Sequence, residues 1–150
     1  MKTLFFYFAI ILFISNTVNL TAQEKNLQQN ISTGKNIKVQ SVILNEIESG
    51  IANKDVKKFS KYFSAQPYLS LVNGVNGYYS SNQAYYILDD FFNSFRVVSF
   101  SLEEVKTDDA VSYGKGDYYY EKKGRREVAH FYVTLSKSGS KWYITQLSIN

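Results

Sequence analysis

The chain contains one histidine, His130, which is the first side chain to consider for acid/base chemistry. A histidine within hydrogen-bond reach of a carboxylate can act as a general acid or base, and Asp117, Asp89 or Asp90 could supply that carboxylate. A single histidine at no defined spacing from an acid is not a catalytic motif. We therefore expect His130 to be a solvated or hydrogen-bonded side chain, and a catalytic group only if the fold places a carboxylate beside it.

Asp89 and Asp90 fall in the middle of a predicted helix, where consecutive side chains point about 100° apart and cannot both face one pocket. Asp90 is expected to lie nearer the apolar stripe of that helix, so it is the acid better placed to serve as a base. The alternative is a structural carboxylate that bonds a hydroxyl or backbone group. Asp90 and His130 are thus the catalytic candidates.

Tyrosine is frequent, with 13 in the chain. Because tyrosine joins a large apolar ring to a polar hydroxyl, it suits the wall of a ligand pocket or a protein interface. The ligand-binding candidates are Tyr86, Tyr113, Tyr118 and Tyr120. The alternative is that strands favour aromatic residues, with Tyr118 and Tyr120 covering one face of a strand while Tyr119 points to the other.

A basic cluster flanks Gly124 beside three tyrosines and consists of Lys122, Lys123, Arg125 and Arg126. Such a combination can bind phosphates, anionic glycans or nucleic acid. Four charges are a small footprint for a nucleic-acid binder, and the net charge of +4 is mild. We expect a solvated hairpin turn and no nucleic-acid partner.

The sequence contains no cysteine, which excludes disulfides, thiolate catalysis, cysteine-based zinc sites and the lipid anchor of a bacterial lipoprotein. No other motif indicates a cofactor or metal site, so none is expected. Gly114 and Gly116 lack the context of a phosphate-binding loop. They are predicted to mark a bulge or a bend of the sheet.

The N-terminus predicts export. Lys2 precedes an apolar run over residues 4–14, and a polar stretch follows up to about Ala22. A signal peptide has an apolar core of roughly 7 to 15 residues, whereas a membrane span needs roughly 20. We expect a signal peptide over residues 1–22 and a mature protein without a membrane span, located in the periplasm or outside the cell.

The mature chain divides into a leader and one domain. Residues 23–36 are rich in Gln, Asn, Lys and Ser and predict a flexible leader, while residues 37–150 form a single domain. Its first helix, over residues 37–52, is predicted to bury a stripe of Val39, Val42, Ile43, Ile47 and Ile51. A short second helix, capped by Asp55, carries Val56, Phe59, Tyr62 and Phe63 and is expected to end at Pro67.

A third helix is predicted to begin at Ser80, which stands at capping-box spacing from Gln83. Its apolar face comprises Ala84, Ile87, Leu88, Phe91 and Phe95. Before it, a short strand over residues 68–72 leads into turns at Asn73-Gly74 and Asn76-Gly77.

After Arg96 the apolar period changes to two, which predicts strands over residues 97–106, 110–122, 127–137 and 141–149 joined by three hairpins. In the third strand Ala129, Phe131, Val133 and Leu135 share one face, and more polar residues share the other. The sheet should therefore have one dry face, which three helices cover, and one mixed face. The predicted fold class is α+β, with helices packed on a curved antiparallel sheet.

This order of elements resembles the nuclear transport factor 2-like, cystatin-like superfamily. The run GYYSSNQAYYILDDFF over residues 77–92 resembles the helix signature of a secreted Bacteroidetes family, domain of unknown function 4783, and residues 141–149 resemble the last strand of the superfamily. The resemblance covers residues 39–150 and implies a sheet that wraps a long helix into a cone. Enzymes of the superfamily place acid/base groups inside that cone, some with more than one histidine. The family has no established activity, so no catalytic residue transfers to this chain.

The sequence favours a non-enzymatic binding module of the cell envelope, which holds a small ligand or an envelope protein at the open end of the cone or on the outer sheet face. One alternative is a small lyase or isomerase that uses Asp90 or His130 in the cone. The other is a structural homodimer through the mixed face of the sheet. A hollow cone would favour the enzyme, and a filled one would count against it.

Overall fold

The structure is a computed structural model that describes residues 39–150. The predicted signal peptide and leader lie outside the described residues. Residues 39–52 are helical, followed by helices α2 (Lys57–Ser60) and α3 (Ser81–Ser94). The strands are β1 (Phe63–Leu71), β2 (Asn76–Tyr78), β3 (Arg96–Lys106), β4 (Val111–Lys122), β5 (Arg125–Ser138) and β6 (Lys141–Ile149).

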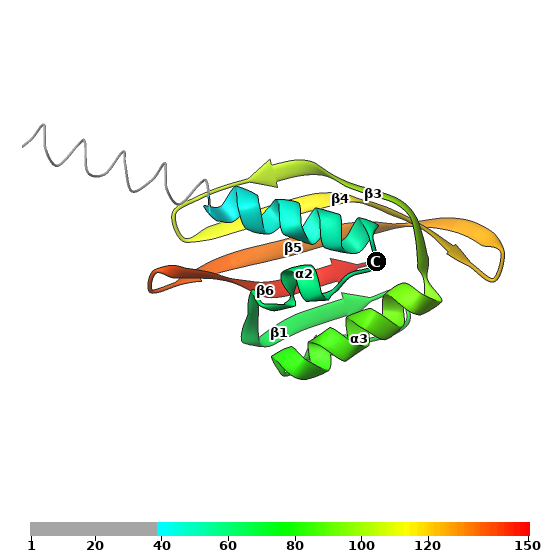
Figure 1. Ribbon diagram of the computed structural model, residues 1–150, viewed down its shortest axis with the longest axis horizontal. Helices are drawn as coiled ribbons and strands as arrows, with labels where there is room; N and C mark the ends of the chain where they lie inside the picture. Colours follow the sequence, from blue (N-terminus) through cyan, green and yellow to red (C-terminus); the bar gives the residue numbers. More distant parts are fainter. Residues whose placement is uncertain (1–38) are drawn as a thin grey trace, which may run out of the picture. The chain divides into compact units, whose positions relative to one another are not determined.

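The six strands of the described residues form one sheet in the order β2-β1-β6-β5-β4-β3. Strands β3 to β6 are a meander of antiparallel pairs, whereas β1 pairs in parallel with β6, the last strand. The helices lie on one side of this sheet (Figure 1). The expected α+β class, with helices on one face of a curved sheet, is confirmed.

Helix α3 begins where the sequence predicts. The Ser80 side chain accepts from the Gln83 N–H at 3.3 Å, and the Gln83 side chain accepts from the Ser80 N–H at 3.0 Å, which completes the capping box. Ala84, Leu88, Phe91 and Phe95 are buried as expected, Ile87 is half-buried, and Phe92 is buried as well. The sequence pattern therefore gave the helix and most of its inner face correctly.

The buried face of the helix over residues 39–52 differs from the prediction. Val39 and Val42 are 42% and 47% exposed, and the inner face is formed instead by Gln40, Ile43, Leu44, Ile47 and Ile51. The buried Gln40 amide is held by one hydrogen bond, since its Nε2 donates to the carbonyl of Asp108 at 2.8 Å, in the connection between β3 and β4, while its Oε1 has no partner within residues 39–150. The start of the helix is thus rotated from the predicted orientation, so that Gln40 instead of Val39 and Val42 faces inward.

The predicted end of the second helical unit at Pro67 is wrong. Helix α2 stops at Ser60, and Phe63 already belongs to β1, which carries Pro67 in its interior. The pairing of β1 with β6 is irregular between Phe63 and Tyr68, and a proline, which has no N–H to donate, is tolerated at such a place. Likewise, residues 76 and 77 form part of the short strand β2 rather than a turn.

The space between the helices and the sheet is filled by a hydrophobic cluster. Its largest fully buried side chains include Tyr118, Phe59, Phe91, Phe92 and Phe131. The rings of Phe91 and Phe95 are stacked with centroids 4.6 Å apart, and the Phe91 ring lies 6.0 Å from that of Tyr118. The interior that could have been a ligand cavity is therefore occupied by the protein's own aromatic rings.

Tyr118 is buried in this cluster with its hydroxyl donating to the carbonyl of Phe95, the C-cap residue that follows α3. Burial, with a smaller contribution from Tyr120, raises the pKa of Tyr118 above its ordinary value of 10.0. The folded state therefore stabilises the neutral phenol relative to the phenolate. Its contribution to stability is complete below pH 10 and is lost as the pH rises above that value.

We predict that Tyr118→Phe lowers the free energy of unfolding at pH 7 by about 1 kcal/mol, because a buried hydrogen bond is lost. The same change should make stability fall less steeply above pH 10, since no phenol then has to ionise in the core. Urea unfolding of both proteins between pH 7 and 11 measures the two effects. An identical decline of both proteins above pH 10 would contradict the assignment.

Candidate functional site

The face of the sheet opposite the helices is here called the open face, because no helix within residues 39–150 covers it. Register places its residues in rows that cross the strands. One row runs from β2 to β4 through Tyr78, Tyr68, Gln146, Thr134 and Tyr113. Further along β4 and β5, Tyr119 and Val128 form a cross-strand pair in which both side chains are exposed. The predicted mixed face is therefore a broad surface with several aromatic rings.

The β3–β4 part of the open face carries paired charges. Glu104 accepts from the Tyr113 hydroxyl at 2.9 Å and from Lys115 Nζ at 3.3 Å. These hydrogen bonds, that of Tyr113 above all, lower the pKa of Glu104, and the carboxylate in turn raises the pKa of Tyr113. Tyr113, a sequence candidate for ligand binding, thus lies on the surface and is held by a carboxylate.

His130 lies on the open face, and the structure does bring a carboxylate to it. Its Nδ1 is 2.9 Å from Oδ1 of Asp117, directly across the β4–β5 pair. The histidine side chain is 86% exposed, whereas that of Asp117 is half-buried, so the imidazole is surrounded by solvent. The predicted partner is present, but it stands on a surface and not inside the molecule.

A hollow of about 430 Å³ lies at the β2–β1–β6 end of the open face. It is called the tyrosine hollow and is lined by Ser64, Gln66, Tyr68, Tyr78, Thr145 and Gln146. The rings of Tyr68 and Tyr78 meet edge to face, with centroids 5.1 Å apart and planes at 66°. The Tyr68 hydroxyl donates to the side-chain oxygen of Asn76 on β2, which fixes the ring. Tyr78 itself is 73% exposed.

A second hollow, of about 370 Å³, lies where β3, β4 and β5 approach their hairpin end. Its lining includes Val98, Tyr119, Tyr120, Glu127 and Val128. The Tyr120 hydroxyl donates to Glu127 at 2.9 Å. Burial, and to a smaller extent this hydrogen bond, raises the pKa of Tyr120. This hollow therefore combines exposed valines with charged side chains, whereas the tyrosine hollow is lined only by uncharged polar and aromatic side chains.

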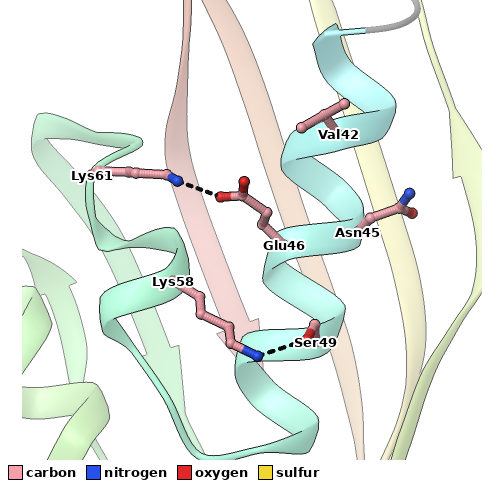
Figure 2. Close-up of a pocket in the computed structure, with 6 residues that line it drawn as sticks. All are labelled: Val42, Asn45, Glu46, Ser49, Lys58 and Lys61. Atoms are coloured by element: carbon pink, nitrogen blue, oxygen red, sulfur yellow. Dashed lines mark hydrogen bonds and ion pairs between the residues drawn. The ribbon is translucent and has the colours of Figure 1, made fainter.

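A groove of about 430 Å³ separates the helix over residues 39–52 from α2. Figure 2 shows two side chains crossing it: Lys61 Nζ lies 2.7 Å from Oε2 of Glu46, and Lys58 Nζ donates to Ser49 Oγ at 2.9 Å. The hydrogen bond from Lys61 lowers the pKa of Glu46, and the carboxylate raises the pKa of Lys61. These two contacts tie the longer helix to α2 and to Lys61, the residue that follows α2.

The other catalytic candidate, Asp90, is exposed on α3, while Asp89 is half-buried, so the expected order of these two acids is reversed. The reason is that Phe92 is buried while Ile87 is only half-buried, which rotates the inner face of the helix toward Asp89 and away from Asp90. Asp90 and His130 stand on opposite sides of the sheet and cannot serve one site. Tyr86 is likewise exposed on α3, where its ring meets that of Tyr85 edge to face at 5.1 Å.

Tyr118 and Tyr120, two further ligand candidates, are buried on the helix side of the sheet. Their rings are stacked 5.7 Å apart within the hydrophobic cluster. Tyr118 and Tyr120 thus cover one face of β4 while Tyr119 points to the other, as the alternative interpretation of the sequence predicts.

The basic cluster lies at the β4–β5 turn, where Lys123 and Gly124 both have positive φ, 51° and 76°. Lys123, Arg125 and Arg126 are exposed, and the Lys122 ammonium lies 4.1 Å from the ring centre of Phe95. No group of acidic, histidine or cysteine side chains among residues 39–150 could hold a metal ion. None of the helices in that part of the chain is both long and apolar enough to cross a membrane.

The lining of the tyrosine hollow was missed by sequence reasoning. The sequence pattern predicts Ser64 and Gln66 at the end of a helical unit, although they belong to β1, and nothing in the pattern distinguishes Gln146 on β6 as a binding residue. An alternation of apolar and polar residues from Phe63 onward is a signal that could have revealed the strand, with Pro67 as its irregular point.

A family model described as a domain of unknown function (DUF4783) matches residues 44–150. The chain belongs to this family. The resemblance to this family that the sequence predicts over residues 39–150 is thereby confirmed for residues 44–150. No curated protein matches the chain.

Solved structures share the fold of this DUF4783 chain. A DUF4783 protein from Bacteroides uniformis is 16% identical, with a TM-score of 0.64, over 71% of this chain and 94% of that one. An NTF-2-like protein of unknown function from Shewanella oneidensis is 13% identical, with a TM-score of 0.52, over 71% and 92% of the two chains. An uncharacterized cystatin-fold protein from Novosphingobium aromaticivorans is 10% identical, with a TM-score of 0.56, over 72% and 94%. At these identities the likeness is one of fold.

Proposed function

We propose that the chain is an exported, non-enzymatic binding module of the cell envelope that holds a small ligand or an envelope protein on the open face of its sheet. The observation that supports this most is the contrast between the two sides. The helix side is filled by buried rings, whereas the open face presents the exposed Tyr78 on β2 and the exposed cross-strand pair of Tyr119 and Val128 on β4 and β5. An exposed tyrosine offers both an apolar ring and a polar hydroxyl, which suits an interaction site.

An acid/base enzyme is the second candidate, and the hydrogen bond between His130 and Asp117 is the observation that favours it. Acid/base catalysis works best in a site that excludes water and surrounds the reacting atoms with fixed dipoles. This pair stands on an exposed surface instead. Binding is therefore the function that the geometry supports better.

The test compares exposed tyrosines on the two sides of the molecule. Compounds and envelope proteins that raise the melting temperature are identified first, since a ligand of the folded state stabilises it. Their Kd is then measured for the wild type, for the double variant Tyr78→Ser and Tyr119→Ser, and for the control Tyr86→Ser on α3. We expect the double variant to bind about tenfold or more weakly, as for a loss at an interface hot spot, and the control to bind as the wild type does.

The reverse pattern, with weaker binding only for Tyr86→Ser, would contradict the proposal. Two other outcomes would replace it. Turnover of a compound that is abolished by His130→Asn, with its binding preserved, would establish the enzyme. A wild type that sediments as a dimer, and a double variant that sediments as a monomer, would establish the structural homodimer.

A further inference from the structure

The strands around the tyrosine hollow are almost free of charge. Neither β1 nor β2 contains a charged residue, and the one charged residue of β6 is Lys141, its first. The six side chains that line the hollow are phenols, hydroxyls and primary amides. A charged ligand would have to give up water there without meeting an opposite charge, which is costly. The hollow therefore selects against ions and in favour of a neutral polar ligand.

Three polar side chains of the hollow, Ser64, Gln66 and Gln146, are available to a ligand. The amides of Gln66 and Gln146 make no hydrogen bond to another side chain or to the backbone within residues 39–150. Each amide offers both a donor and an acceptor, and so does the Ser64 hydroxyl, whereas the Thr145 hydroxyl already pairs with Ser136 Oγ at 3.0 Å and with the carbonyl of Thr134 at 3.4 Å. A ligand whose own groups both donate and accept, as alcohol hydroxyls do, can pair with all three available side chains.

The aromatic part of the hollow is already in position before a ligand arrives. The Tyr68 ring is held by its bond to Asn76 and by the edge-to-face contact with Tyr78. Most of the Tyr78 ring remains exposed, so it presents a flat apolar surface at the rim of the hollow. A side chain that is already ordered loses little entropy on binding, which favours a ligand that packs against it.

We propose that the tyrosine hollow binds a neutral carbohydrate, an inference that rests on the proposed binding function of the open face. A pyranose has apolar C–H faces that pack on an aromatic ring and a rim of hydroxyls that donate and accept, which matches one exposed ring beside three available uncharged polar side chains. The volume of about 430 Å³ lies within the usual range for small-molecule sites, roughly 300 to 1,000 Å³. A proline-rich peptide could also pack on the rings, but it offers few donors to the amide and hydroxyl oxygens.

The test is calorimetric titration of the mature protein with neutral hexasaccharides built from glucose, mannose, xylose, galactose or N-acetylglucosamine, up to about 10 mM. An oligogalacturonate serves as the charged probe and a proline-rich decapeptide as the competing class. We expect at least one neutral oligosaccharide to bind, and the charged one not to. Tyr78→Ala should weaken that binding about tenfold or more, and Gln146→Ala should weaken it severalfold.

A control and a second open-face variant locate the binding. Tyr86→Ala, on α3, is the control and should leave the Kd within about twofold of the wild type. Tyr119→Ala, on the open face but outside the hollow, reports whether the ligand lies elsewhere on that face. Because Tyr78 and Gln146 are at least partly exposed, their replacement should preserve the fold, which the melting temperature of each variant verifies.

Failure of this inference is distinguishable from failure of the proposed function. If no neutral oligosaccharide binds, or if only the peptide binds, the carbohydrate assignment is overturned, while ligands of another class that depend on Tyr119 would still uphold binding on the open face. If an oligosaccharide binds and only Tyr86→Ala weakens it, both are overturned. If an oligosaccharide binds and its binding depends on Tyr119 but not on Tyr78, the proposal of binding on the open face is kept and the tyrosine hollow is overturned as the site.

Discussion

Replacement of Phe91 by alanine is expected to lower the free energy of unfolding by about 3 to 5 kcal/mol, the usual effect of removing a buried phenylalanine ring. Phe91 is 1% exposed and lies on the inner face of α3. Its ring stacks on Phe95 at 4.6 Å and contacts Phe92 and Tyr118 with centroids 5.6 Å and 6.0 Å away. The cavity would open at the centre of this aromatic cluster, where neighbouring rings cannot easily close it.

Urea unfolding monitored by circular dichroism measures the change, and Tyr86→Ala is the matched control on the same helix. Tyr86 is 63% exposed, so its replacement should change stability by about 0.5 kcal/mol or less. Equal midpoints for Phe91→Ala and the wild type would show that α3 does not press this face on the sheet. A total stability of 5 to 15 kcal/mol is typical of small domains, so the Phe91 variant should be near the limit of folding.

The elements that the sequence predicted well are those whose signals are local. Ser80 and Gln83 form their capping box within one turn of helix, and the apolar spacing that follows needs no distant partner. The turn at Lys123 and Gly124 is equally local, since both residues adopt the positive φ of a two-residue hairpin turn. Such signals determine a helix end or a strand register before the rest of the chain is considered.

The contact between His130 and Asp117 could have been predicted from that turn. A two-residue turn at 123 and 124 pairs Lys122 with Arg125, and counting five residues outward along both strands pairs Asp117 with His130. Residues that face each other in an antiparallel pair lie on the same side of the sheet. Register therefore establishes their proximity, but not their exposure, which depends on the helices covering only the other face.

The strand β1 and the tyrosine hollow depend on contacts that no local pattern encodes. β1 is placed by parallel pairing with β6, in which Tyr68 lies beside Gln146, far along the chain. Periodicity cannot reveal that pairing, and Pro67 in the middle of the strand suggests a break. The hollow is lined from β1, β2 and β6 together, so its residues are recognisable as a set only after the sheet has been assembled.

The face that the first helix buries shows a second limit of pattern reasoning. Val39 and Val42 are apolar and correctly spaced, yet the helix buries Gln40 in their place because its amide finds the carbonyl of Asp108. A hydrogen bond to a distant loop can outweigh the burial of a valine at the margin of the stripe. Hydrophobic spacing predicted the helix itself but not its rotation at that end.

Gly116 is the position in the sheet where a single methyl group should do most damage. The pairing of β3 with β4 shifts its register between Leu102 and Glu104, opposite Gly116, so β3 is bulged there. A Cβ on Gly116 would stand 2.1 Å from the backbone oxygen of Ser101, far inside van der Waals contact. Since the obstacle is backbone and not a side chain that can rotate, β3 itself would have to move.

We therefore expect Gly116→Ala to cost about 3 kcal/mol, the upper part of the usual range for overpacking, whereas the neighbouring Gly114→Ala serves as its control. A Cβ on Gly114 would meet side-chain methyls of Leu102 at 3.2 Å and Leu44 at 3.3 Å, which can shift slightly, and alanine would also lower the entropy of the unfolded chain. The control should thus lie within about 1 kcal/mol of the wild type in urea unfolding. Equal stabilities for the two variants would mean that β3 can move away from β4 at little cost, and that the bulge does not fix the edge of the sheet.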